Sequence, residues 1–330
     1  MKIAIFCGVY AESNSRKAAG PAIVALNLVK SLSRYSSFKF TLHTASDYSY
    51  IYNFPDVIRT NNSHYTKEYL KQFDAIHVLS NKSSALKISD LGFQPILGTN
   101  VVFDFPSPEG LTEEQRKSNQ HIIDDENNIC KRKWKAVIVN HPELRPLYGK
   151  RFNIDPSKID VFFSGVDTKL FSPSSNKKES TVWVGPGKHK GEDEVKQLVS
   201  MLPNLNWKLY GLTKETQYSY NDFVKILHDT KIYLSLSHAE TQGLATMEAM
   251  SSGCPVIASR FTCGVSKPLF SDGIIIVERN LEYIKDTILR LISNDSERNQ
   301  LALNARRVIE SQFTLKHMTK NYEDLIKKYI

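Results

Sequence analysis

Two carboxylates, Glu240 and Glu248, lie with seven residues between them in the segment HAETQGLATMEAMSSGCPVIAS. The surrounding residues are small or apolar, although 24% of the chain is Asp, Glu, Lys or Arg. Carboxylates accept strong charge-assisted hydrogen bonds from hydroxyl groups, and they also ligate hard metal ions. The pair therefore fits two chemistries. It either hydrogen-bonds sugar hydroxyls or binds one metal ion, for which His238 is the only further candidate ligand nearby.

The local sequence predicts where the two carboxylates lie. Residues 231–237, KIYLSLS, have the composition of a buried strand. A helix is expected to begin close to Gly243, where LATMEAMSS supplies good helix formers, and to end before Gly253. Glu240 would then lie on the loop at the carboxyl end of the strand, and Glu248 about one and a half turns into the helix.

The start of this helix is a candidate anion site. The backbone amides of Gln242, Gly243 and Leu244 would point out of the helix start toward a negatively charged ligand. A ligand lying across the helix start, with its phosphates on these amides, would place sugar hydroxyls near both carboxylates. The alternative needs no ligand, because Glu240 can interact favourably with the helix dipole while Glu248 is a solvated helix residue.

A glycine-rich loop with two lysines follows another strand-like run in TVWVGPGKHKGEDEV. Gly185 and Gly187 allow the backbone to approach a ligand closely, while Lys188 and Lys190 supply positive charge for phosphate. The spacing matches neither the dinucleotide-binding fingerprint nor a P-loop. An ordinary turn between a strand and a helix is the alternative interpretation.

Short apolar runs alternate with helical stretches along almost the whole chain, which is typical of parallel sheets covered by helices. The runs expected to be strands are KIAIFC, FKFTLHT, DAIHVLS, QPILGTN, KAVIVN, KIDVFF, TVWVG, NWKLYG, KIYLSLS, CPVIAS and GIIIVE. The stretches expected to be helices include AIVALNLVKSLSR, LTEEQRKSNQHIIDDENNICKRKW, LATMEAMSSG and NLEYIKDTILRLI. A segment rich in Gly, Pro, Ser and Lys at 164–180 separates two such sets. The sequence therefore predicts an α/β protein with two doubly wound domains and a ligand cleft between them.

The composition limits the classes to which the chain can belong. Its 330 residues, 41% of them hydrophobic, suit two globular domains, and no apolar run approaches the ~20 residues of a membrane-spanning helix. The net charge of +8, with basic clusters at 131–135 and 145–151, suits phosphorylated ligands, anionic lipid surfaces or nucleic acid. Because no nucleic-acid-binding motif is evident, we expect no nucleic-acid partner.

Four cysteines, Cys7, Cys130, Cys254 and Cys263, lie far apart and show no metal-ligand spacing. Free thiols in a reducing compartment are the expected state, so we expect a cytoplasmic protein. Residues 2–7 are expected to be a core strand and not an export signal, because no small-residue cleavage site follows them.

The segment ETQGLATMEAMSSGCPVIAS resembles the signature of retaining GT-B glycosyltransferases of family 4, the glycosyl transferases group 1 type. That signature reads Glu, seven residues, Glu, Ala-Met, a small residue, Gly and Pro-Val. Three further pieces are similar to the family in the same order along the chain: Gly20 before the first helix, SGVDTKLFSP before the second domain, and WVGPGKHKG in place of Val-Gly-Arg-x-x-x-x-Lys-Gly. The closing FTLKHMTKNYEDLIKKYI also resembles the family's last helix.

The resemblance covers essentially the whole chain and implies the GT-B fold, in which two Rossmann-like domains face each other across a cleft. It implies an acceptor-binding domain over 1–166, a nucleotide-sugar-binding domain over 167–312, and a helix over 313–330 that packs back toward the first domain. Within the site, Glu248 would bind the ribose hydroxyls and Glu240 would lie near the donor sugar. The implied donor-binding residues are Glu248, Gln242, Gly243, Leu244, Gly185, Gly187 and Gly20, and the implied catalytic residues are Glu240, Lys190 and Lys188.

The resemblance also shows where this chain departs from the family. Lys190 matches the family's phosphate-binding lysine, and the amides of Gln242–Leu244 match those on the sugar or distal phosphate. The family's arginine is replaced by Pro186 in a loop one residue shorter, which leaves Lys188 to supply that charge. Lys lacks the bidentate fork of Arg, so the replacement bears on donor affinity and donor type. The histidine often found after the family's fourth strand is not evident, and Asn100 lies in that neighbourhood.

The implied reaction transfers a hexosyl or related sugar from a nucleotide-diphosphate sugar, with UDP or GDP, to a hydroxyl acceptor such as a glycan or a lipid-linked sugar. Retention of the anomeric configuration is implied by the resemblance alone. Lysines and helix-start amides can stabilise the leaving diphosphate, so no metal or other cofactor is expected. The sequence also contains no Asp-x-Asp pair of the kind that metal-dependent sugar transferases use.

Other functions stay open at this point. A degenerate nucleotide-sugar-binding module is favoured by the missing arginine, whereas an epimerase of the same fold would need acid and base groups that are not evident. A phosphorylase would need a pyridoxal lysine site, which is not evident either. Asp104 and His141 lie near strand ends, but structural roles suit them better than that of a general base. The positive charge and the family's lipid-linked acceptors motivate a further hypothesis, peripheral association with an anionic membrane surface.

Overall fold

The computed structural model of the chain contains two compact units. The described residues up to Ser164, together with Lys316–Ile330, form the first unit, and Gly165–Leu315 form the second. The residues that the structure describes are 1–8, 20–44, 54–79, 81–98, 124, 127–175, 178–185, 190–211, 218–238, 240, 242–259 and 272–330.

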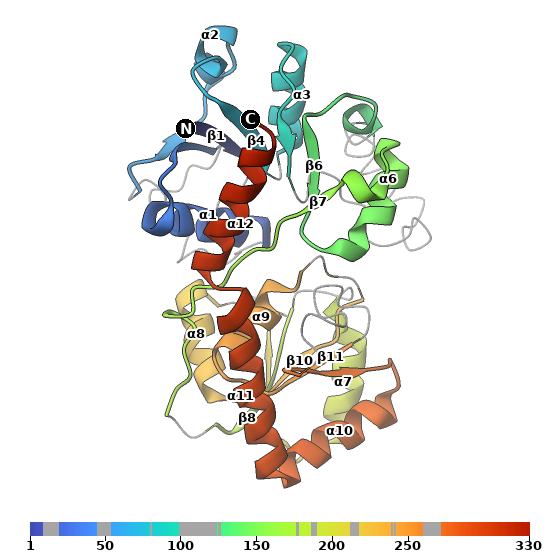
Figure 1. The fold of residues 1–330 in the computed structure, drawn as a ribbon. Coiled ribbons are helices and arrows are strands. Elements are labelled where there is room, and N and C mark those ends of the chain that lie inside the picture. The colour runs from blue at the N-terminus through green and yellow to red at the C-terminus, as the bar shows by residue number, and fades with distance from the viewer. Residues whose placement is uncertain are drawn as a thin grey trace. The chain divides into compact units, whose positions relative to one another are not determined.

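The first unit is built on a seven-stranded parallel sheet (Figure 1). Its strands are β1 (Lys2–Cys7), β2 (Lys39–Thr44), β3 (Val57–Arg59), β4 (Ala75–Leu79), β5 (Ile96–Leu97), β6 (Ala136–Val139) and β7 (Asp160–Val161). Their order across the sheet is β3-β2-β1-β4-β5-β6-β7. This is the order of a doubly wound sheet, in which the direction of winding reverses between β1 and β4.

Helices cover both faces of this sheet, which is why a central strand such as β1 is buried along almost its whole length. They are α1 (Gly20–Tyr35), α2 (Lys67–Leu70), α3 (Lys82–Asp90), α6 (Arg145–Phe152) and α12 (Leu315–Lys328). Side chains of α2, α3 and α6, among them Leu70, Ile88 and Tyr148, pack in one core with the strand residues Phe6 and Val78.

The other face of the sheet carries α1 and the helix that closes the chain, α12. Ser31 of α1 and Thr319 of α12 share a buried hydrogen bond of 2.8 Å. The Tyr322 hydroxyl of α12 lies 3.0 Å from Nδ1 of His77 in the middle of β4. Because these polar contacts are buried between two helices and a central strand, α12 is an integral part of the first unit.

The second unit contains a five-stranded parallel sheet. Its strands are β8 (Ser180–Val184), β9 (Trp207–Tyr210), β10 (Thr230–Ser235), β11 (Val256–Ser259) and β12 (Ile275–Val277). Its helices are α7 (Glu192–Met201), α8 (Tyr220–Asp229), α9 (Leu244–Ser251), α10 (Leu281–Ser293) and α11 (Asp295–Gln312). The order β12-β11-β10-β8-β9 is again doubly wound, with its switch point between β8 and β10.

Residues of β10 alternate between two helical layers, as the period of a strand requires. Ile232 and Leu234 pack in one core with Leu198 of α7 and Ile288 of α10. On the opposite face the Thr246 hydroxyl of α9 donates to the Ser235 hydroxyl at 2.9 Å. Strand β10 therefore fixes the start of α9 relative to the sheet.

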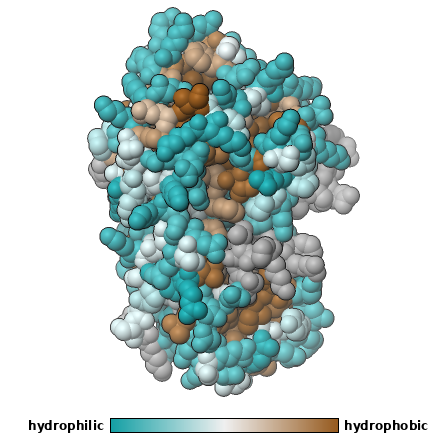
Figure 2. Space-filling view, viewed as in Figure 1, coloured by the Kyte–Doolittle hydropathy of each residue, from teal (hydrophilic) through white to brown (hydrophobic). Residues whose placement is uncertain are grey.

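The structure confirms the predicted fold class, since each of the eleven runs expected to be strands contains a strand. Strand β3 and helices α2, α3, α6, α8 and α11 have no counterpart among the predicted elements. The helix expected over 111–134 lies mostly outside the described residues. Among the described helices, none combines the length and the apolar composition that crossing a bilayer requires. Hydrophilic side chains cover most of the face seen in Figure 2.

Candidate functional site

The switch point of the second sheet lies where two strands lead to opposite sides of that sheet. In open parallel sheets, ligands bind at the carboxyl ends of strands next to such a point. The segment after β8 begins at Gly185 and leads to Lys190, and the segment after β10 begins at Leu236 and leads to Glu240. Two of the predicted site residues therefore come from the two segments that border the switch point.

Lys190 and Glu240 form an ion pair between these segments. Nζ of Lys190 contacts Oε1 of Glu240, and the Ser237 hydroxyl donates to the same oxygen at 3.1 Å. The side chains of Lys190 and Glu240 are 25% and 20% exposed. A partly buried pair is less screened by solvent than a surface pair, yet a ligand can still reach both groups. A polar ligand can thus interact with the ammonium of Lys190 and the carboxylate of Glu240.

Gly185 has a structural reason to be glycine. A β-carbon at this position would lie 2.5 Å from Cβ and 2.8 Å from Cγ of Lys190, closer than side chains pack. The backbone of Lys190 is also fixed, because Nε1 of Trp183 donates to its carbonyl oxygen at 3.0 Å. The absence of a side chain at Gly185 therefore allows Lys190 to pass close to the end of β8.

Helix α9 begins without a side chain at its N-cap. Its N-cap is Gly243, whose φ of 68° is in the left-handed region that glycine tolerates without strain. The side chain of the preceding Gln242 is buried and donates to Sδ of Met247 at 3.4 Å. The backbone amides at this helix start, including that of Leu244, therefore have no N-cap side chain as acceptor and provide a partial positive charge.

Glu248 is buried in α9, with only 3% of its surface exposed. The Tyr220 hydroxyl at the start of α8 donates to Oε1 of Glu248 at 2.8 Å. Burial and this carboxylate raise the pKa of Tyr220 well above its usual value, and they raise that of Tyr218 to about 12. The interpretation of Glu248 as a solvated helix residue is therefore wrong, because its carboxylate is buried and accepts a hydrogen bond inside the unit, which offsets part of the cost of burial.

His238 has partners other than the two glutamates. Its Nε2 lies 3.2 Å from Oε1 of Glu194 and 2.7 Å from Nη2 of Arg279. Arg279 also forms an ion pair with Glu194 and donates to the Leu236 carbonyl at 3.1 Å. Within the described residues, no three His, Cys, Asp or Glu side chains are grouped as metal ligands. The contacts of His238 are therefore with Glu194 and Arg279.

The remaining predicted residues lie elsewhere. Gly187 and Lys188 are outside the described residues. Gly20 is the first residue of α1 in the first unit. His141 is buried after β6, where its Nδ1 accepts from the Glu143 amide at 3.3 Å as a helix cap, in agreement with the structural role expected of it.

Sequence reasoning missed Tyr220 and Arg279. A capping box formed by Ser219 and Asp222 precedes the apolar residues of α8 and signals that helix, with Tyr220 at its first position. No spacing rule pairs Tyr220 with a glutamate on another helix, so only the fold reveals that contact. Arg279 follows β12, and no local sequence pattern marks it as a site residue.

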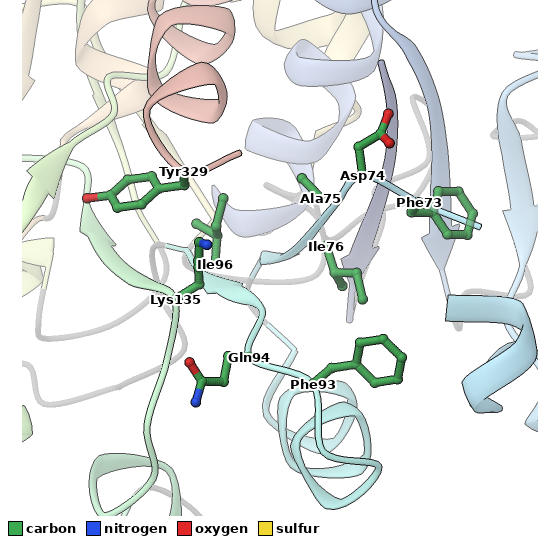
Figure 3. A pocket seen from close by; sticks show the side chains of 9 residues that line it. All are labelled: Phe73, Asp74, Ala75, Ile76, Phe93, Gln94, Ile96, Lys135 and Tyr329. Carbon is green, nitrogen blue, oxygen red and sulfur yellow. The ribbon is translucent and has the colours of Figure 1, made fainter. Parts of the chain in front are cut away.

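A pocket of about 170 Å³ lies in the first unit, at the amino ends of its strands (Figure 3). Asp74 precedes β4 and Lys135 precedes β6, while Tyr329 comes from the end of the chain. In Figure 3, Lys135 and Gln94 lie on one side and Phe73 on the other. Ligands of doubly wound sheets bind at the opposite, carboxyl edge, so this pocket is not the candidate site.

Comparisons with known proteins find similar glycosyltransferases. Residues 186–308 match the family model described as glycosyl transferases group 1. A curated relative is the UDP-Gal:alpha-D-GlcNAc-diphosphoundecaprenol alpha-1,3-galactosyltransferase of Escherichia coli, 22% identical over 77% of this chain and 75% of that one.

Solved structures share the whole fold. Sucrose-phosphate synthase from Thermosynechococcus elongatus has a TM-score of 0.71 at 16% identity and covers 99% of this chain and 98% of its own. HepE from Anabaena, solved in complex with UDP, has a TM-score of 0.71 at 14% identity and covers 99% of this chain and 100% of its own.

The two doubly wound sheets, the residues gathered at the second switch point and these similarities define a glycosyltransferase with the GT-B fold. Within it, residues 186–308 are similar to the glycosyl transferases group 1 model.

Proposed function

We propose that this glycosyltransferase transfers a hexose from a UDP-sugar to a hydroxyl of a glycan or a lipid-linked sugar. The observation that carries the proposal is the Lys190–Glu240 ion pair at the switch point of the second sheet, followed by the uncapped start of α9 and the buried Glu248. UDP is supported by the names of similar proteins, since HepE was solved with UDP and the E. coli relative is named for UDP-Gal.

Each group has a role in this proposal. The amides at the start of α9 and the Lys190 ammonium bind the diphosphate, whose negative charge increases as the sugar departs. Donor binding draws Lys190 away from Glu240, which frees the Glu240 carboxylate to accept from hydroxyls of the donor sugar. Glu248 accepts from the ribose hydroxyls. Lys188 supplies further positive charge in place of the family's arginine.

Two finer features belong to the same proposal. The positive groups at the diphosphate make transfer independent of a divalent metal, because they supply the electrostatic stabilisation that a metal would otherwise give. The anomeric configuration of the sugar is retained, in line with the group 1 signature carried by Glu240 and Glu248.

We assign binding of the acceptor to the first unit. In terms of the chain, we assign 1–166 to acceptor binding, 167–312 to donor binding, and 313–330 to the helix that returns to the first unit. The basic clusters at 131–135 and 145–151, part of a net charge of +8, support peripheral association with anionic membranes that hold lipid-linked acceptors. Co-sedimentation with anionic vesicles at low salt tests this part, and no binding would remove it.

A transfer assay tests the proposal directly. The protein is incubated with UDP-glucose, UDP-galactose or UDP-N-acetylglucosamine and a panel of glycan and lipid-linked acceptors, and acceptor-dependent UDP release is measured. We expect release with one donor, an unchanged rate in EDTA, and a product whose glycosidic proton shows the donor's anomeric configuration. Loss of activity in EDTA would contradict metal independence, and an inverted product would contradict retention.

The second candidate function is a nucleotide-sugar-binding module without transferase activity. Pro186, in place of the family's phosphate-binding arginine, favours it. The same assay separates the two functions, because a binding module would take up a UDP-sugar and release no UDP with any acceptor.

A further inference from the structure

The hydrogen bond between Tyr220 and Glu248 is enclosed within the second unit. Tyr220 is 5% exposed and Glu248 is 3% exposed, and the hydroxyl of the tyrosine lies 2.8 Å from Oε1 of the carboxylate. A hydrogen bond to a charged group is stronger than one between neutral groups. Since solvent does not compete for it here, this bond holds one oxygen of Glu248 in place.

The tyrosine ring is itself held by its surroundings. It packs edge-on against Phe171, with 5.4 Å between the ring centroids. The carbonyl of Phe171 accepts from the Ser251 hydroxyl at 2.6 Å and from Nη1 of Arg306 at 2.8 Å. These bonds fix the segment that carries Phe171 against the end of α9 and against α11. The ring of Tyr220 therefore packs against a buried residue whose backbone is held by two hydrogen bonds.

The backbone of Tyr220 is fixed as well. It is the first residue of α8, directly after the N-cap Ser219. The Ser219 hydroxyl accepts from the amide of Asp222, and the Asp222 carboxylate accepts from the amide of Ser219. This capping box fixes the first turn of the helix. Hydroxyl, ring and backbone of Tyr220 are thus all constrained before any ligand binds.

The hydroxyl of Tyr220 remains a donor at neutral pH. Burial, the Glu248 carboxylate and the nearby Asp167 carboxylate all raise the pKa of Tyr220. The proton therefore stays on the tyrosine oxygen, and Glu248 is the acceptor. A carboxylate fixed in this way can receive a ligand hydroxyl without first losing side-chain freedom, which is a gain in affinity through preorganisation.

We propose that Tyr220 is a positioning residue for ribose recognition, which orients the Glu248 carboxylate so that it accepts hydrogen bonds from the ribose hydroxyls of the bound nucleotide. The inference rests on the proposed function, because it takes Glu248 as the ribose ligand. Tyr220 does not contact the nucleotide in this account. It acts only through the orientation of Glu248.

The substitution Tyr220→Phe removes the donor and keeps the ring that packs on Phe171. We expect the Kd for UDP, measured by calorimetry, to rise about tenfold, since one charge-assisted hydrogen bond no longer orients the carboxylate. The Kd for 2′,3′-dideoxy-UDP, which lacks both ribose hydroxyls, should change less than about twofold. In transfer assays the KM for the donor should rise in the same proportion, with kcat at saturating donor nearly unchanged.

Tyr322→Phe is a matched control. Tyr322 is equally buried and its hydroxyl also bonds a side chain, that of His77, but it lies in the first unit. This variant should bind UDP and the dideoxy analogue as the wild type does, and thermal melts of both variants show whether each is folded. Glu248→Gln is the second test, because it should reduce the preference for UDP over the analogue without needing Tyr220 to be changed.

The outcomes separate the inference from the proposed function. The inference is supported when the wild-type protein prefers UDP to the analogue and the Tyr220→Phe variant has lost most of this preference. A variant that keeps the full preference, or binds UDP more tightly, overturns the inference and leaves the proposed function standing. Wild-type protein that binds no UDP overturns both.

Discussion

At the scale of single residues, the proposed donor binding depends on a lysine that already has a partner. Lys190 is paired with Glu240 and has its backbone bonded to the Trp183 indole, so its ammonium is placed before a donor arrives. Its partner Glu240 also accepts from Ser237, which keeps this carboxylate satisfied when the lysine turns to a phosphate.

Replacing Lys190 by Met keeps the length of the side chain and removes its charge. We predict that UDP affinity falls about tenfold or more, because a charge-assisted bond to the diphosphate is lost. Calorimetric titration with UDP measures the effect. Lys196→Met is the control, since Lys196 is exposed on α7 and pairs with Glu192. Equal UDP affinities of wild type and Lys190→Met would contradict the phosphate role of this lysine.

Gly185→Ala tests the placement of Lys190 without touching its charge. The added methyl would lie 2.5 Å from Cβ of Lys190, so the lysine must shift. We predict a several-fold loss of UDP affinity and a loss of stability of about 1–3 kcal/mol. Gly92→Ala is the control, because Gly92 has a φ of 87° with no atom near the added methyl. It should lose stability through backbone strain alone and bind UDP normally.

At the scale of elements, the Arg306 side chain of α11 forms hydrogen bonds to Ser251 at the end of α9. The guanidinium of Arg306 donates to the carbonyls of Phe171, Ser251 and Thr168. Because Phe171 and Ser251 are buried, removal of the guanidinium costs their carbonyls a donor, and the Phe171 carbonyl keeps only the Ser251 hydroxyl. The same residue supports the segment against which Tyr220 packs, so α11 stabilises the site from a distance.

Arg306→Met should destabilise the second unit by about 2–4 kcal/mol, since three carbonyls each lose a hydrogen bond from the guanidinium at once. Urea unfolding followed by tryptophan fluorescence measures the change. The neighbouring Arg307 is exposed, and Arg307→Met should stay within about 0.5 kcal/mol of the wild type. Equal stabilities of the two variants would show that the carbonyl contacts of Arg306 contribute little.

The first unit carries a pH-sensitive element in β2. His43 is fully buried, stacks on Phe6 and lies near His64, and burial lowers its pKa to about 3. In the unfolded chain the pKa is near 6.5, so the unfolded state binds more protons as pH falls below that value. Stability is therefore lost on acidification, by about 2 kcal/mol from His43 between pH 7 and pH 5.

His43→Phe removes this titration and keeps an aromatic ring on Phe6. We predict that the fall in unfolding free energy between pH 7 and pH 5 becomes smaller by about 2 kcal/mol. His77, whose pKa burial lowers to about 4, should still contribute its own share. Urea titrations at the two pH values measure the difference. An unchanged pH dependence would mean that His43 is not kept neutral by burial.

Most of these strands and helices could be predicted because local patterns of apolar, polar and helix-forming residues indicate them. The run KIAIFC predicts β1, and the helix formers between Gly243 and Gly253 predict α9, within a residue or two of their bounds. Strand β3 was missed because its three residues are too short for an alternating pattern. Helix α11 was missed because its sequence is mostly polar, and its buried residues Ala305 and Ile309 are too few to mark a face.

At the scale of the whole molecule, the sequence supports a hypothesis for the class of site but does not reveal the contacts within it. The motif with Glu240 and Glu248 indicated a nucleotide-sugar site, and the order of strands places it at a switch point. The ion pair between Lys190 and Glu240 joins residues on two different loops, and Tyr220 reaches Glu248 from another helix. Such contacts depend on tertiary packing, which no periodicity along the chain encodes.

The most direct test of the central claim is calorimetric titration of UDP, GDP and their hexose conjugates into the wild-type protein and into Glu248→Gln. The variant keeps the shape of the side chain and an acceptor for Tyr220, so it should remain folded. We expect selective binding of UDP and a UDP-hexose to the wild type, weakened at least tenfold in the variant. Failure of every nucleotide to bind the wild type, or equal binding by the variant, would contradict the assignment of this site to a nucleotide-sugar donor.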